Sequence, residues 1–172
     1  MTKDGKILVG VSSCLLGHRV RYDGQSKAVD YIVDKLATQL EFVAVCPEVE
    51  AGLGVPRPAI HLVDDLVKPR IIGVVEPQLD VSEQLYYYCD RILEKLSGVC
   101  GFILKARSPS CGIASVSIKI NETIYPHEDG VFAALLREKR PDLPLVDEEA
   151  IVDPALRQIF LHRVQDYYRK QR

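Results

Sequence analysis

The chain has 172 residues, a length that suits one domain with a single hydrophobic core. Hydrophobic residues make up 47% of it and charged residues 27%, and the formal net charge of −2 gives no sign of a nucleic-acid or membrane partner. No apolar run approaches the roughly 20 residues of a membrane-spanning helix, and the N-terminus lacks the pattern of a signal peptide. These features predict a cytoplasmic protein.

The first strands of the chain alternate with a helix. Residues 6–11 form an apolar run that predicts a strand, and Ser12-Ser-Cys14 follows at its carboxyl end. Apolar residues at helical spacing predict a helix over residues 26–39. A second strand over residues 41–45 leads directly into Cys46-Pro-Glu48, and the glycine- and proline-rich residues 49–58 predict a loop.

The middle of the chain predicts a hairpin, a helix and a third strand. Residues 60–63 and 70–75 are suited to pair as a small antiparallel hairpin. Asp80 is expected to be the N-cap of a helix that runs to about Leu96. The apolar residues 99–104 then predict a buried strand.

Shorter elements complete the pattern. Residues 116–120 alternate between apolar and polar side chains, which predicts a half-buried edge strand. A helix is expected to open near Gly130 and to end at about Lys139, and residues 143–146 are expected to be extended. Asp153 and Pro154 form an N-cap and first-turn pair for a final helix.

Strands that alternate with helices predict an α/β fold: a mainly parallel sheet with helices on both faces, a small antiparallel hairpin and a C-terminal helix. In such sheets, ligands bind outside the carboxyl ends of the strands. Cys14, Cys46 and Cys111 each follow an apolar strand, directly or after a few residues. We therefore expect these three sulfurs to meet at one edge of the sheet.

The five cysteines are an odd number, and none of them forms a Cys-x-x-Cys pair. In a reducing cytoplasm, this argues for buried thiols, metal ligands or a reactive thiol rather than disulfides. Cys89 lies inside a predicted helix and Cys100 inside a predicted strand, so both are expected in the core.

Three thiolates held close together repel one another, so they require a cation. Zinc is one candidate, because three protein ligands would leave its fourth position open. An iron–sulfur cluster is the other, because three cysteines on a cubane leave one iron free as a Lewis acid. The alternative is that the cysteines are small buried residues in turns. Spacing alone does not separate these readings.

Several reactive or charged side chains lie close together in the segment Lys105-Ala-Arg-Ser-Pro-Ser-Cys-Gly112. Two cations, two hydroxyls and a thiol follow a strand here, and Pro109 and Gly112 shape the turn. Glu48 lies two residues after Cys46, where its carboxylate is suited to general acid or base catalysis. The charged residues suited to bind a polar or anionic ligand are Arg21, Arg57, Lys105 and Arg107.

Three blocks of sequence together resemble the thiouracil desulfidase family over about residues 5–150. The blocks are Val11-Ser-Ser-Cys-Leu-Leu-Gly17 with Val20-Arg-Tyr-Asp-Gly24, then Cys46-Pro-Glu-Val49 with Pro56-Arg-Pro58, then Lys105 with Ser108-Pro-Ser-Cys-Gly112. One departure is Ile124-Tyr-Pro-His-Glu-Asp-Gly130, which stands where many relatives have Ile-Tyr-Asp-Gly and which predicts a different local loop.

The resemblance implies a [4Fe-4S] cluster held by Cys14, Cys46 and Cys111, whose free iron binds the sulfur of a thiolated pyrimidine base. It implies non-redox desulfuration, in which water replaces sulfur on a small thiouracil-like substrate. Glu48 and Ser108 are expected to handle protons and position the substrate. The other residues expected to bind substrate are Ser12, Arg21, Tyr22, Asp23, Arg57, Lys105 and Ser110.

The resemblance also bears on domain organisation. We expect residues 1–152 to form the desulfidase-like α/β domain and residues 153–172 to form a basic C-terminal helix. This helix is similar to the junction of a longer subtype, in which a second helical domain follows. Two rival functions remain at this point: a zinc-binding or apo thiol protein, and a non-catalytic binding or scaffold module.

Overall fold

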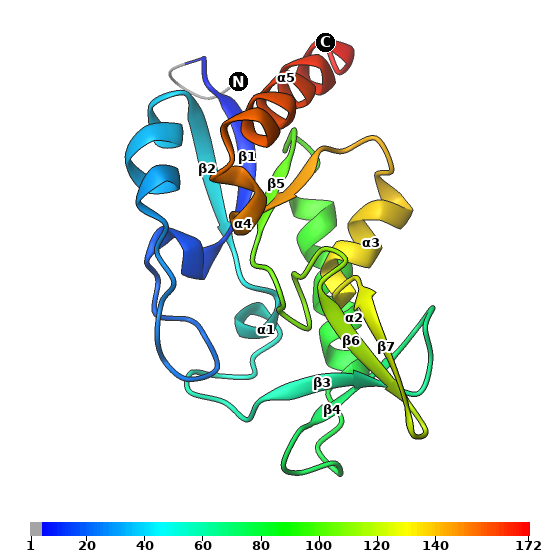
Figure 1. Cartoon of the computed structure of the whole chain (residues 1–172). Helices are drawn as coiled ribbons and strands as arrows, with labels where there is room; N and C mark the ends of the chain where they lie inside the picture. The colour runs from blue at the N-terminus through cyan, green and yellow to red at the C-terminus, as the bar shows by residue number, and fades with distance from the viewer. Residues whose placement is uncertain (1–4) are drawn as a thin grey trace.

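The structure, a computed structural model, describes residues 5–172 (Figure 1). Its strands are β1 Ile7–Ser12, β2 Leu40–Val45, β3 Ile60–Val63, β4 Arg70–Gly73, β5 Phe102–Leu104, β6 Val116–Ile120, β7 Thr123–Glu128 and β8 Leu145–Asp147. Its helices are α1 Pro47–Glu50, α2 Ser82–Lys95, α3 Val131–Lys139, α4 Glu148–Ile151 and α5 Pro154–Lys170, with the short helical turns η1 Ser13–Leu16, η2 Tyr31–Lys35 and η3 Leu36–Thr38. No helix within the described residues is both long and apolar enough to span a bilayer.

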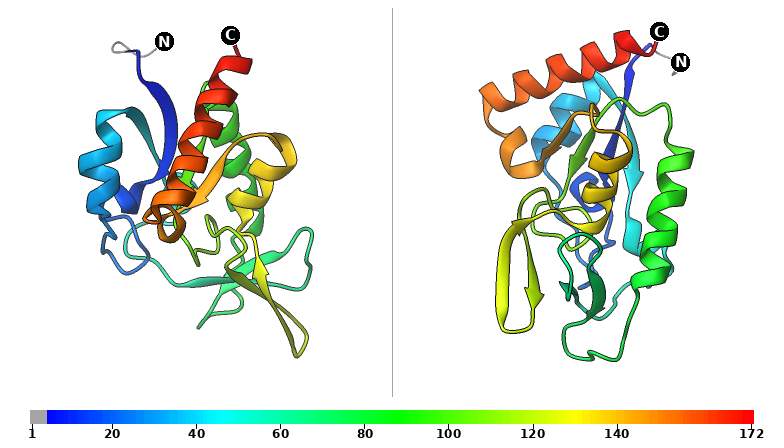
Figure 2. Two further views of the ribbon diagram at one scale, coloured as in Figure 1. Left: turned by 45° about the horizontal axis from the view of Figure 1, so that its top comes forward. Right: turned by 90° about the vertical axis from the view of Figure 1, so that its right-hand side faces the viewer.

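Four parallel strands form the main sheet, in the order β2-β1-β5-β8. Helical segments cover both faces of this sheet (Figure 2). On one face, α2 and α3 pack against side chains that include Phe102 and Leu104, and on the other, α5 and the turns η2 and η3 pack against side chains that include Val9 and Ile103. The predicted α/β architecture is confirmed.

A glycine in β1 sets how closely the central strands and α3 pack. A Cβ atom at Gly10 would lie 2.1 Å from the ring of Phe102 on the adjacent strand. Because glycine has no Cβ, the Phe102 ring lies over β1 and meets Phe132 of α3 edge-on, with 5.5 Å between ring centroids. This contact anchors α3 on the sheet.

A second sheet has the order β4-β3-β6-β7 and includes the predicted hairpin, β3 and β4. The expectation of an edge strand over residues 116–120 is wrong, because β6 pairs in parallel with β3 and antiparallel with β7. The sequence did not predict β7, whose residues are mostly exposed and include Pro126. Between Val116 and Ile118 the β6–β7 register shifts, which accommodates the irregular edge strand.

The helix predicted over residues 26–39 is also shorter than expected. Helical structure starts at Tyr31, because the preceding backbone bonds elsewhere. The amide of Lys27 donates to the carbonyl of Cys14 at 2.9 Å, and the amide of Val29 donates to the carbonyl of Leu15 at 3.1 Å. The predicted loop over 49–58 likewise starts inside a helical turn, α1.

The final helix begins as predicted, at Pro154. The carboxylate of Asp153 accepts hydrogen bonds from the amides of Ala155 and Leu156 and so caps the helix. Phe160 and Val164 are buried against the main sheet.

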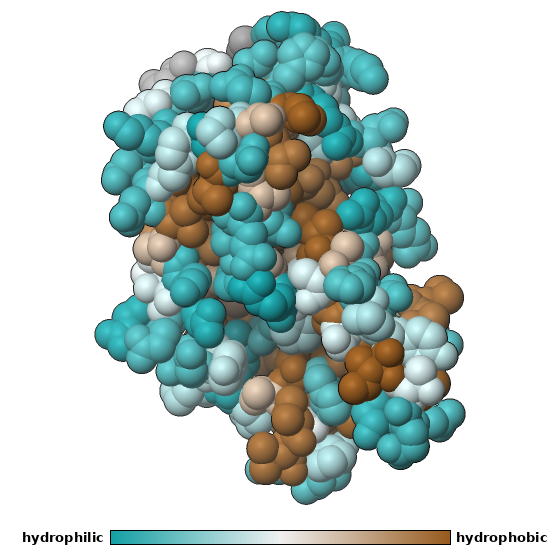
Figure 3. All heavy atoms as spheres, viewed as in Figure 1, coloured by the Kyte–Doolittle hydropathy of each residue, from teal (hydrophilic) through white to brown (hydrophobic). Residues whose placement is uncertain are grey.

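At the other end of the molecule, the second sheet exposes apolar side chains near its turns (Figure 3). The most exposed of them are Val67 and Val75.

Candidate active site

A cavity of about 470 Å³ opens at the carboxyl ends of the main sheet. Segments that follow β1, β2 and β5 form most of its wall, which is the edge where parallel sheets bind ligands. The three strands are direct neighbours, with β1 between β2 and β5. Residues that are far apart in the sequence therefore face a common space.

Cys14, Cys46 and Cys111 all line this cavity. Cys14 lies in η1 directly after β1, Cys46 is the first residue after β2, and Cys111 lies in the loop after β5. Cys14 and Cys111 are buried, Cys46 is half-buried, and all three are free of disulfides. The structure thus brings together the three thiols that parallel strands predict at one edge.

Burial keeps these thiols protonated in the metal-free chain. Desolvation, and then the nearby Cys46 sulfur, raise the pKa of Cys14 to about 11, although Lys105 and Arg21 oppose the shift. Burial likewise raises the pKa of Cys111 well above its ordinary value, against a hydrogen bond from the Ser12 hydroxyl. Bound cations are the usual means of stabilising thiolates in such surroundings. Within residues 5–172, no three His, Cys, Asp or Glu side chains are grouped so that they could hold a metal ion.

Glu48 is a buried carboxylate with two firm partners. One oxygen accepts a hydrogen bond from the hydroxyl of Ser110 at 2.8 Å, and the other accepts one from Nε of Arg57 at 2.7 Å. The side chains of Arg57 and Glu48 are only 4% and 10% exposed. The ion pair fixes the orientation of the carboxylate beside Cys46, and Glu48 still lines the cavity.

Arg57 also joins two loops of the wall. Its Nη1 donates to the carbonyls of Val20 at 2.9 Å and Gly54 at 3.0 Å, and its amide donates to the carbonyl of Tyr22 at 2.9 Å. The loop after η1 is thereby held against the Pro56-Arg-Pro58 segment.

The loop that carries Cys111 is stabilised by its own serine. The hydroxyl of Ser108 accepts hydrogen bonds from the amides of Ser110 at 3.2 Å and Cys111 at 3.1 Å. This arrangement leaves the hydroxyl proton of Ser108, which lines the cavity, able to donate to a ligand.

The same loop caps helix α3. The carbonyl of Pro109 accepts a hydrogen bond from the amide of Val131 at 3.0 Å, and the carbonyl of Ser110 accepts one from the amide of Phe132 at 2.8 Å. Gly130 makes this approach feasible, because a Cβ there would lie 2.6 to 2.8 Å from backbone atoms of Ser110 and Ser108.

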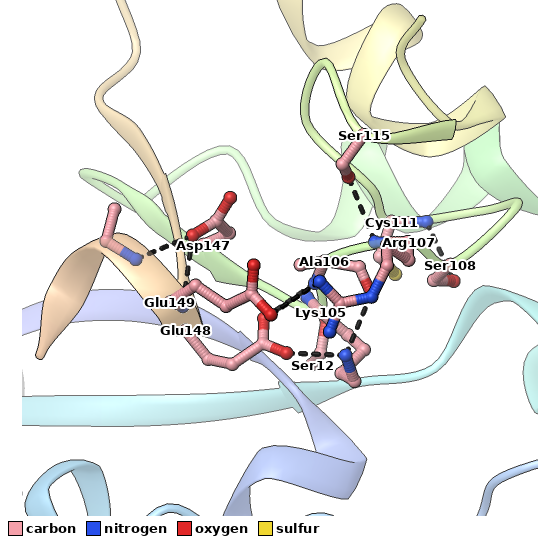
Figure 4. Close-up of polar contacts among 11 residues, drawn as sticks. Ser12, Lys105, Ala106, Arg107, Ser108, Cys111, Ser115, Asp147, Glu148 and Glu149 are labelled. Carbon is pink, nitrogen blue, oxygen red and sulfur yellow. Dashed lines mark hydrogen bonds and ion pairs between the residues drawn. The ribbon is translucent and has the colours of Figure 1, made fainter. Parts of the chain in front are cut away.

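Lys105 and Ser12 link the central strands at the cavity (Figure 4). The Lys105 amide donates to the Ser12 hydroxyl at 3.0 Å, and this hydroxyl hydrogen bonds to the Cys111 sulfur. Nζ of Lys105 forms an ion pair with Glu148 at 2.5 Å. Sequence reasoning did not select Glu148, although it follows the extended segment predicted before it and so obeys the strand-end rule that selected the cysteines.

The remaining predicted residues divide into two groups. Arg21, Tyr22 and Arg107 line the cavity, and Tyr22 and the side chain of Arg107 are exposed. Asp23 is not among the described lining residues, and its carboxylate instead pairs with Arg21 at 3.3 Å. The wall also includes polar residues that were not predicted, Ser13 and Lys27.

The other two cysteines are core residues, as predicted. Cys89 is fully buried in α2, and Cys100 is 2% exposed just before β5. Neither lines the cavity among its described residues. They therefore serve as internal controls for the three cavity thiols.

Comparisons with known proteins agree with this geometry. A family model described as 2-thiouracil desulfurase matches residues 9–148. The chain is similar to a solved structure described as [4Fe-4S]-dependent thiouracil desulfidase TudS, with 31% identity and a TM-score of 0.70, over 90% of this chain and 99% of that one. No curated protein matches significantly. The chain therefore belongs to the 2-thiouracil desulfurase family, and the prediction that it is a desulfidase is confirmed.

Proposed function

We propose that this enzyme carries out non-redox desulfuration of a small thiolated substrate, a thiouracil-like base, at a [4Fe-4S] cluster held by Cys14, Cys46 and Cys111. The observation that carries the proposal is that three thiols from three neighbouring strand ends line one cavity. Family membership and the description of the similar structure as [4Fe-4S]-dependent support it.

The donor set fits such a cluster. Thiolates are its preferred ligands, and three of them leave one iron without a protein ligand. Each cysteine would bind a different iron atom, so the sulfurs need not converge on one point as they would around a single ion. When bound, the cluster supplies an open iron that acts as a Lewis acid toward the substrate sulfur.

Glu48 is the proposed general base. Its two hydrogen bonds, from Ser110 and Arg57, orient the carboxylate but leave further lone pairs able to accept a proton. Water that attacks the thiolated carbon would give up its proton to this group. In the overall reaction, the carbon exchanges its sulfur for the oxygen of one water molecule, the sulfur leaves as sulfide, and no electrons are transferred.

Ser108, Arg21, Tyr22 and Lys105 are the proposed binding groups. The Ser108 hydroxyl donates to a polar atom of the base, while its oxygen holds the Cys111 loop in place. Arg21, Tyr22 and Lys105 line the cavity and contact the substrate directly. Ser12, Ser110 and Arg57, the other predicted substrate-binding residues, also line the cavity, and their bonds to Lys105, Cys111 and Glu48 orient those groups toward the substrate. Asp23 orients Arg21.

Iron and acid-labile sulfide analysis of protein purified or reconstituted without oxygen tests the proposal. About four irons per chain are expected for a cubane cluster, together with equal amounts of uracil and sulfide released from 2-thiouracil. Zinc in place of iron would overturn the cofactor. A fully loaded protein that releases no sulfide from thiolated pyrimidines would overturn the substrate.

Two broader expectations also stand as proposals. We infer a cytoplasmic location, supported by the five free cysteines. We also infer that residues 1–152 form the catalytic domain and that residues 153–172 form a helix which can join a second helical domain. The exposed Leu156 and Ile159 on the outer side of α5 support this second inference.

A further inference from the structure

The ion pair between Lys105 and Glu148 lies beside the cavity and has no role in the proton transfers described above (Figure 4). It is largely buried, since the two side chains are 13% and 8% exposed. The second oxygen of Glu148 accepts a hydrogen bond from the amide of Ala106 at 2.6 Å. Glu148 itself is not among the described residues that line the cavity, so any effect on substrate passes through Lys105.

The described hydrogen bonds of the Lys105 ammonium use two of its three N–H groups. A lysine ammonium has three N–H groups. Glu148 accepts from Nζ at 2.5 Å, and the carbonyl of Ala106 accepts at 2.8 Å. Since Lys105 lines the cavity, the third N–H can donate to a ligand held there.

We propose that Glu148 is a positioning residue that holds the Lys105 ammonium where it donates to a polar ring atom of the thiolated base. The inference rests on the proposed function and assigns a role to a residue outside the cavity wall. Lysine has a flexible four-carbon stem, so its ammonium needs a fixed partner to keep one direction. A contact that is equally strong before and during the reaction affects KM and leaves kcat unchanged.

Glu148 also contacts the start of the loop that carries Cys111, so a purely structural role is the competing account. That account predicts loss of iron and of thermal stability in Glu148 variants. Positioning of Lys105 predicts a change in KM at normal iron content. Iron content and KM, measured on the same variants, therefore distinguish the two accounts.

The main test is a double-mutant cycle on anaerobically loaded protein with Glu148→Gln, Lys105→Met and the double variant. In Glu148→Gln, the Lys105 ammonium loses its ion pair and with it its fixed hydrogen bond to the substrate. Loss of one such bond from a charged donor should raise KM by about tenfold. Lys105→Met should raise it at least as much, and the double variant no further, because Glu148 acts through Lys105. Asp90→Asn, which disrupts an exposed lysine pair with Lys139, is the matched control and should keep the normal KM.

A second readout needs neither cluster nor turnover. In metal-free protein, the ¹⁵N–¹H signal of the Lys105 ammonium, assigned by its loss in Lys105→Met, should be visible because its protons are shielded and hydrogen bonded. It should disappear in Glu148→Gln. If the enzyme is inactive on thiolated bases but the signal still depends on Glu148, the positioning of Lys105 stands and the proposed substrate is wrong. Failure of the further inference can thus be distinguished from failure of the proposed function.

Two results would overturn the inference: a normal KM in Glu148→Gln, or additive losses in the cycle accompanied by low iron content. If Glu148→Gln does not fold, the paired change Lys105→Met with Glu148→Met replaces the buried ion pair by apolar groups, which proteins often tolerate. That variant must show the raised KM at normal iron content.

Discussion

At the scale of single residues, position relative to the strand ends separates the cavity thiols from the core thiols. Cys14, Cys46 and Cys111 line the cavity, whereas Cys89 lies in the interior of α2. We expect a serine substitution at any of the three cavity positions to reduce bound iron to background. Cys89→Ser should keep about four irons per chain, as a cubane requires. Iron and sulfide analysis after identical anaerobic reconstitution checks this, and a full cluster in any of the first three variants would contradict the ligand assignment.

Glu48 allows a second test at this scale. Its carboxylate is oriented by Arg57 and Ser110, and Glu48→Gln keeps the shape of the side chain but removes the basic oxygen. We expect kcat to fall by about 100-fold or more, the usual contribution of a general base, while iron content stays normal. Glu50→Gln, at an exposed position of the same short helix, is the control. A normal kcat in Glu48→Gln would remove its catalytic role.

At the scale of elements, the loop that carries Cys111 is in close backbone contact with the start of helix α3 at Gly130. Gly130→Ala places a Cβ against backbone rather than against a movable side chain, so the loop must shift. We expect lower iron content and a lower melting temperature, because both the cysteine and the helix cap are displaced. Gly98→Ala is the matched control, since a Cβ there would meet nothing within 4 Å. Equal iron content in the two variants would contradict the proposed coupling.

The same scale shows why some elements could be predicted and others could not. The strands of the main sheet are short apolar runs, and α5 has its Asp153 cap, so local sequence suffices. Strand β7 carries little apolar signal and gains its structure from pairing with β6. Residues 26–30 have a helical pattern, but their backbone bonds to η1 instead. Long-range hydrogen bonds of this kind leave no local periodicity.

Candidate site residues follow the same division. The strand-end rule predicted where the three cysteines lie, because it depends only on where apolar runs stop. Glu48 and Lys105 were selected because they belong to the segments that carry Cys46 and Cys111. Glu148 also obeys the rule, but a glutamate after a short extended segment has no distinctive neighbours. Its importance comes from a partner 43 residues earlier in the chain.

At the scale of the whole molecule, the buried thiols make the metal-free protein sensitive to alkaline pH. Burial in the core raises the pKa of Cys89 above its ordinary value of 9.0. Above that pH, the unfolded chain releases a proton that the folded chain retains, so the free energy of unfolding decreases. Urea midpoints measured at about pH 8 and about pH 10, on either side of the ordinary thiol pKa, should fall more steeply for the wild type than for Cys89→Ala. Parallel declines would contradict this reading.

The cavity wall has a consequence for biosynthesis. Its first cysteine follows β1, near the start of the chain, whereas the residue that holds Lys105 follows β8, the last strand. Since β5 pairs with both of these strands, Glu148 can hold Lys105 only after synthesis has passed β8. We therefore expect a cluster to enter a folded domain rather than a chain whose synthesis has not yet reached β8.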